Sequence, residues 1–72
     1  MKYLVIIEST ATGYSAYVPD LPGCIATGQT KKKVEDNIHE AIVMHLEGLR
    51  EEGSVFPPPH TDAEYMDIAL RA

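Results

Sequence analysis

The sequence predicts an α+β domain in which three strands are followed by one long helix and a final strand. Two observations support this order. The first 28 residues contain short apolar or alternating runs separated by Gly- and Pro-rich turns, a pattern typical of strands. A single helical pattern follows, in which apolar residues recur at spacings of three and four. Since only one helix is available, it can cover only one face of the sheet.

The first three predicted strands differ in their expected burial. Tyr3–Ile7 is an unbroken apolar run, which favours a central strand buried on both faces. Tyr14–Val18 alternates, so we expect a half-exposed strand. The two prolines of Pro19–Gly23 cannot donate ladder hydrogen bonds and therefore interrupt the sheet. Cys24–Thr27 is then a short third strand.

The helix is predicted from Thr30, a good N-cap, to about Glu52, with Gly53 as the stop. Its apolar stripe comprises Val34, Ile38, Ala41, Ile42, His45, Leu46 and Leu49. A lone histidine within such a stripe, His45, is expected to be a neutral residue of the core or of an interface. After three prolines, Tyr65–Leu70 alternates well enough to be the last strand, with Met66, Ile68 and Leu70 facing the core.

The length of 72 residues predicts a single domain, residues 1–72, with a marginal core. A chain of this size buries only about 60% of the surface that it exposes when unfolded. Cys24 is the only cysteine, so no disulfide can form within the chain, and no Cys/His cluster offers a structural metal site. The remaining common way to stabilise so small a core is association with another chain. We therefore expect a homo-oligomer, a dimer or a tetramer.

The charge is unevenly distributed. Six Lys and Arg residues stand against eleven Asp and Glu residues, which gives a net charge of −5. Residues 1–34 carry a net charge of +2, and the part from Glu35 onward carries −7. Phosphate backbones require a dense basic footprint, so direct binding of nucleic acid is not expected, whereas a basic protein partner is. No apolar run approaches the roughly 20 residues of a membrane span. We expect a cytoplasmic protein without a membrane partner.

Several segments resemble the HicB antitoxin family. The resemblance rests on Gly13–Cys24 (GYSAYVPDLPGC), Thr27–Thr30 (TGQT), Asn37–Ile42 (NIHEAI), His45–Gly53 (HLEGLREEG) and the prolines ending at Pro59. It covers nearly the whole chain. The resemblance implies a truncated RNase H-like β-β-β-α-β fold, a four-stranded mixed sheet of order 3-2-1-4 in which the first strand is central and parallel to the last.

The same resemblance implies a binding protein of a type II toxin-antitoxin system. HicB-like proteins neutralise HicA, a small basic toxin that cleaves messenger RNA, and many carry an additional DNA-binding domain. Because this sequence ends directly after the last predicted strand, we expect the short form without that domain, and operator binding is not carried over. No enzymatic activity and no cofactor are expected. One departure is Lys31–Lys33, where relatives often place acids.

Candidate contact residues fall into two groups. The first is the loop predicted to bind the toxin: Asp20, Leu21, Pro22, Gly23 and Cys24. Here the simpler interpretation of Asp20 is a turn residue whose carboxylate binds nearby amides, and that of Cys24 is a small buried thiol. The second group is predicted to lie in an oligomer interface: Tyr14, Tyr17, Lys31, Lys32 and Lys33. Tyrosines favour interfaces. Three cations in the first turn of a helix oppose the helix dipole, which acids from another chain could compensate. The simpler interpretation of the three lysines is a solvated face.

Two other functions are possible from the sequence. A diverged RNase H-like nuclease would need several convergent carboxylates to hold two metal ions, and the first three strands supply only Glu8 and Asp20. An orphan oligomeric module that has lost its toxin would keep the fold without a toxin partner.

Overall fold

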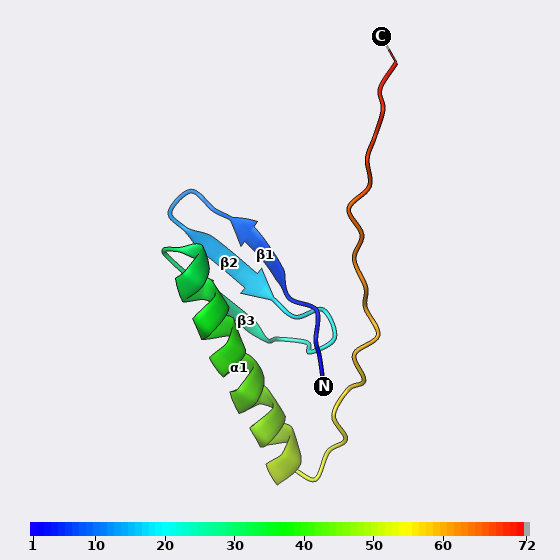
Figure 1. The fold of residues 1–72 in the computed structure, drawn as a ribbon. Helices are drawn as coiled ribbons and strands as arrows, with labels where there is room; N and C mark the ends of the chain where they lie inside the picture. The colour runs from blue at the N-terminus through cyan, green and yellow to red at the C-terminus, as the bar shows by residue number, and fades with distance from the viewer. Residues whose placement is uncertain (72) are drawn as a thin grey trace.

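The computed structural model describes residues 1–71 and contains three strands and one helix (Figure 1). The strands are β1 (Ile6–Ser9), β2 (Tyr14–Tyr17) and β3 (Ile25–Gly28), and the helix is α1 (Lys31–Glu51). The strands form an antiparallel sheet of order β1-β2-β3. Nothing in residues 1–71 forms a helix long and apolar enough to cross a membrane.

The register of the sheet separates an inner from an outer face. Ala16 lies opposite Ile7 on β1 and Ala26 on β3, and all three pack in or against the core. Successive side chains of a strand point to opposite faces. The neighbouring row therefore lies on the outer face, where Tyr17 is opposed by Ile6 and Ile25. The predicted alternation of β2 is confirmed, since Ala16 is buried and Tyr17 is 41% exposed.

The predicted helix is confirmed at both ends. Thr30 is the N-cap, and its Oγ1 accepts a hydrogen bond of 3.0 Å from the Lys33 amide. At the other end Gly53 adopts a positive φ of 73° and donates to the Arg50 carbonyl, while Ser54 donates to the Leu49 carbonyl. These two bonds form a Schellman motif, in which glycine avoids the Cβ penalty of left-handed backbone.

The core lies between the helix and the inner face of the sheet. Its buried members are Ala16, Val18, Leu21, Cys24, Val34 and Ile38. The helix packs against β2 and β3, and its N-terminal half provides the buried residues. A helix of 21 residues is about 32 Å long, whereas a four-residue strand is about 13 Å long. The C-terminal half of the apolar stripe, including His45, therefore extends past the sheet and is only half-buried (Figure 1).

Two expectations about the sheet are wrong for this chain. Residues 65–70 form no strand: the segment is extended but exposed, and it runs away from the sheet (Figure 1). Consequently β1 is an edge strand, not a central one, and the predicted order 3-2-1-4 is present only as far as its first three strands. Strand β1 also begins later than predicted, because β2 turns away after Tyr17 and leaves residues 3–5 without a paired neighbour.

Candidate functional site: a tethered Pro-Gly loop

The loop between β2 and β3 consists of two consecutive tight turns. The Leu21 amide donates to the Val18 carbonyl at 3.1 Å, and the Cys24 amide donates to the Leu21 carbonyl at 3.1 Å. Each turn has proline at its second position, where the fixed φ of proline is suited to the turn. In the second turn Gly23 takes a φ of 83°, as the third position of a type II turn requires. The Pro-Asp-Leu-Pro-Gly sequence therefore specifies a rigid double turn.

The double turn directs its side chains to opposite sides. Leu21 and Cys24 point into the core, where they are 0% and 4% exposed. Burial raises the pKa of the Cys24 thiol, as expected for an unreactive buried cysteine. Pro22 and Gly23 are exposed at the tip of the loop. Of the five residues predicted to contact a toxin, only these two present their surface to solvent.

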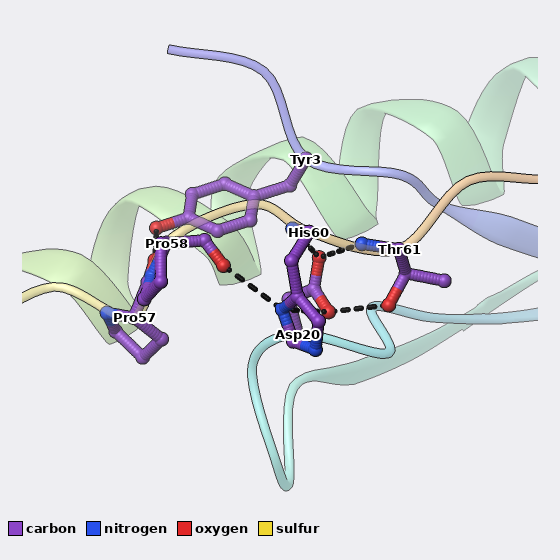
Figure 2. Close-up of polar contacts among 6 residues, drawn as sticks. All are labelled: Tyr3, Asp20, Pro57, Pro58, His60 and Thr61. Atoms are coloured by element: carbon purple, nitrogen blue, oxygen red, sulfur yellow. Dashed lines mark hydrogen bonds and ion pairs between the residues drawn. The ribbon is translucent and has the colours of Figure 1, made fainter.

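The remaining loop residue, Asp20, is buried and anchors the C-terminal segment (Figure 2). Its Oδ2 accepts hydrogen bonds from the backbone amides of His60 at 2.9 Å and Thr61 at 3.0 Å, and its Oδ1 accepts one from the Thr61 hydroxyl. The His60 ring Nδ1 lies 3.0 Å from Oδ1. We call this set of contacts the Asp20 latch. The interpretation of Asp20 as a turn residue that binds nearby amides is wrong: its carboxylate does bind amides, but they lie 40 and 41 residues later in the sequence.

A second contact fixes the same segment. The Tyr3 hydroxyl donates a 2.6 Å hydrogen bond to the Pro57 carbonyl, just before the latch (Figure 2). The prolines from Pro57 to Pro59 stiffen the chain between the two contacts. The N-terminus, the loop and the segment after the helix are thus joined at one place.

The latch should open in acid. The hydroxyl of Thr61, followed by the two backbone amides and His60, lowers the pKa of Asp20 from its ordinary value of 3.8, against the opposing effect of burial. A carboxyl whose pKa is lower in the folded state stabilises that state above its unfolded pKa, and the contribution is lost as the pH falls through the folded pKa.

We expect the Thr61 amide resonance to stay constant above about pH 5 and to shift as the pH falls below 3.8. Asp20→Ala should remove this titration. Asp62→Ala, which removes an exposed carboxylate outside the latch, should preserve it. A Thr61 resonance that titrates unchanged in Asp20→Ala would contradict the assignment.

Exposed apolar residues flank the loop at its base. Tyr17 ends β2 and Ile25 begins β3, and the two are paired across the sheet. Tyr17 is 41% and Ile25 70% exposed. Together with Pro22 and Gly23 at the tip, they form what we call the loop-end surface. Sequence reasoning placed Tyr17 in an oligomer interface and did not single out Ile25, although the alternation of β3 could have revealed it.

The other predicted interface residues lie elsewhere. Tyr14 is half-buried against the core, so little of it is free for an interface. Lys31, Lys32 and Lys33 are exposed at the start of α1, and Lys32 forms a 2.6 Å ion pair with Asp36 one turn later. This pair raises the pKa of Lys32. Exposed pairs of this kind contribute little to stability. Within residues 1–71, no three His, Cys, Asp or Glu side chains converge as a metal site would require.

His60, Thr61 and Tyr3 are the site residues that sequence reasoning missed. Nothing in the local pattern around His60 and Thr61 indicates a partner 40 residues earlier. The one available signal is the run of three prolines before them, which predicts a stiff, extended backbone whose amides are free to bind an acceptor elsewhere.

The fold is that of a small α+β domain, in which one helix packs on a three-stranded antiparallel sheet and the loop between β2 and β3 is tethered to the C-terminal segment. A structure described as the HicA3 and HicB3 toxin-antitoxin complex contains a chain that matches with a TM-score of 0.70 and 37% identity, over 83% of this chain and 70% of that one. Residues 3–69 match the family described as HicB_like antitoxin of bacterial toxin-antitoxin system, and the chain belongs to this family.

Relatives with a similar sequence occur in a phage and in an archaeon. An uncharacterised 14.9 kDa protein of Haemophilus phage HP1 is 36% identical over 93% of this chain, which spans only 50% of the phage protein. A UPF0150 protein of Thermoplasma acidophilum is 45% identical over 79% of this chain and 84% of its own length.

Proposed function

We propose that this chain is the antitoxin of a type II toxin-antitoxin system, which binds a small basic HicA-like, RNA-cleaving toxin and masks its surface. The observation that carries the proposal is the likeness to a chain of the HicA3 and HicB3 complex. The net charge of −5 supports it, because an acidic chain attracts a basic partner and speeds their encounter. The proposed role is steric and electrostatic, without catalysis, cofactor or direct binding of nucleic acid.

The loop-end surface is the contact region that we propose for the toxin. It keeps the exposed part of the predicted loop, Pro22 and Gly23, and adds the apolar side chains of Tyr17 and Ile25. Exposed apolar groups on a rigid support are suited to binding, because little conformational entropy is lost when the partner docks. The two turns provide that rigidity.

The test is co-expression with any small basic protein encoded beside this chain. We expect a stable complex and restored growth. Ile25→Asp should weaken the complex by about tenfold or more, since an apolar contact of about 1.5–3 kcal/mol is lost. Met44→Asp is the matched control: Met44 is 68% exposed and belongs to α1, not to the loop-end surface, and we expect binding to be retained.

Three results would change the proposal in different ways. Failure to form a complex with the basic neighbour rejects toxin binding. A complex that does not restore growth leaves a binding protein but rejects the antitoxin role. A complex weakened by Met44→Asp and not by Ile25→Asp moves the contact region to the helix.

A further inference from the structure

The last ten described residues form an extended arm with exposed apolar side chains, and this arm does not pack on the core. We define residues 62–71 as the C-terminal arm. Every residue of the arm is exposed, including three apolar residues spaced two apart, Met66 (76%), Ile68 (73%) and Leu70 (89%). In an extended segment such residues lie on one side. The arm therefore presents a continuous apolar edge to solvent, as a strand without a sheet would.

The sheet has a free edge that is suited to such a strand. Among residues 1–71, strand β1 pairs only with β2, so the backbone groups on its other side have no ladder partner in the described part of the chain. A free, unprotected edge of this kind is a template for pairing with another strand. It is also the position, beside the first strand, where the resemblance to the HicB family implies a fourth strand.

An apolar groove lies beneath this edge. The helix packs on β2 and β3, and no Cα atom of β1 lies within 8 Å of a helix Cα atom. The space left between them is a groove of about 420 Å³, lined mainly by Tyr3, Val5, Ile7, Ile38 and Ile42, with Glu35 and His39 on the helix side. A strand added to β1 would direct every second side chain over this groove. The spacing of Met66, Ile68 and Leu70 matches that requirement.

The arm of the same chain does not fill the position. Residues 63–65 and residues 4–7 line a common pocket of about 440 Å³, but no backbone hydrogen bond joins the arm to the strand. The arm starts directly after Thr61, which the Asp20 latch holds, and the stiff Pro57–Pro59 segment precedes it. The Cα radius of gyration is 15.0 Å, whereas a compact chain of this length has about 11 Å. The latch and the proline segment thus hold the start of the arm in an extended course that does not pack on its own sheet.

We propose that two copies exchange their arms, each arm adding to the free edge of β1 in the other copy and covering its groove with Met66, Ile68 and Leu70. Exchange of identical elements is a low-cost route to a two-fold dimer, because both copies gain the same contacts. It covers the exposed apolar arm and the unpaired edge together, and it completes a four-stranded sheet from two chains. The exchange does not depend on toxin binding, so its failure leaves the proposed antitoxin function untouched.

The test uses the purified full chain and two arm variants. The mass in solution is measured by light scattering over a dilution series, and backbone amide exchange is followed in the same samples. We expect a dimer in which amides of residues 5–7 and 66–70 are protected together. Ile68→Asp places a charge over the groove. Since each dimer contains two such junctions, we expect its dissociation constant to rise at least about 100-fold. Ala69→Asp introduces the same charge on the opposite side of the arm and should change it by less than about fivefold.

Each alternative outcome overturns the exchange. A monomer with protected arm amides shows that the arm closes onto its own chain. A monomer with unprotected arm amides shows that the arm is free. A dimer that Ile68→Asp leaves intact shows that the copies meet through another surface. Ile68→Asp and Ala69→Asp should not unfold the domain, because the arm lies outside the core. A change in association therefore reports on the arm and not on a loss of stability.

Discussion

Replacing Leu21 by alanine should lower the free energy of unfolding by about 2–5 kcal/mol, the range measured for truncating a fully buried leucine. Leu21 is 0% exposed, and it belongs to the buried core together with Val34 and Ile38 of the helix. A domain of this length has a total stability of only about 4–11 kcal/mol. The variant should therefore be marginally folded, which urea denaturation followed by helical circular dichroism will show.

Pro22→Ala is the matched control, since Pro22 is the next residue and lies exposed at the loop tip. We expect a loss below about 1 kcal/mol, caused by the greater freedom of the unfolded chain. The pair separates two roles of the loop. If Leu21→Ala retains its stability but loses toxin binding, Leu21 is a contact residue and its assignment to the core is wrong.

Gly28→Ala should destabilise the protein by about 1–3 kcal/mol or more, because it overpacks the junction between β3 and the helix. A Cβ at Gly28 would lie 2.6 Å from the Val34 amide nitrogen and 2.9 Å from its Cα. Both atoms belong to backbone, so no side-chain rotation can relieve the clash. Thermal and urea unfolding of the variant measure the loss.

The same substitution at Gly48 should have the opposite sign. Gly48 lies within the helix, and a Cβ there meets no atom within 4 Å. Alanine in a helix interior is favoured over glycine by about 0.5–1 kcal/mol. A similar loss at both positions would show that the close approach at Gly28 is not the cause of the effect.

Features encoded by neighbouring residues were predictable from the sequence. The helix ends depend on Thr30 and Gly53, each of which acts on amides or carbonyls within five residues of itself, and both were predicted correctly. The inward and outward faces of β2 follow from simple alternation and were also predicted. The family could be recognised because its motif lies in a continuous stretch around the Pro-Gly loop.

Features that depend on distant residues were not predictable. The partners of Asp20 lie 40 and 41 residues later in the sequence. A Pro-Asp-Leu-Pro-Gly turn is typical of an exposed loop, so the sequence does not indicate that the Asp20 carboxylate is buried. The predicted strand at residues 65–70 has the right alternation, but alternation states only that one side prefers burial. It does not state which chain buries that side. The same pattern therefore fits a strand paired within its own sheet and an extended arm that leaves it.

The Asp20 latch also makes the loop and the arm thermodynamically dependent on each other. Asp20 belongs to the loop whose tip is proposed to meet a toxin, and Thr61 is the residue from which the arm departs. If a ligand of the loop binds the closed latch more tightly than the open one by some factor, bound ligand must shift the latch equilibrium toward closure by the same factor. Binding at one end of this small domain and the direction taken by its last ten described residues are therefore linked through a single carboxylate.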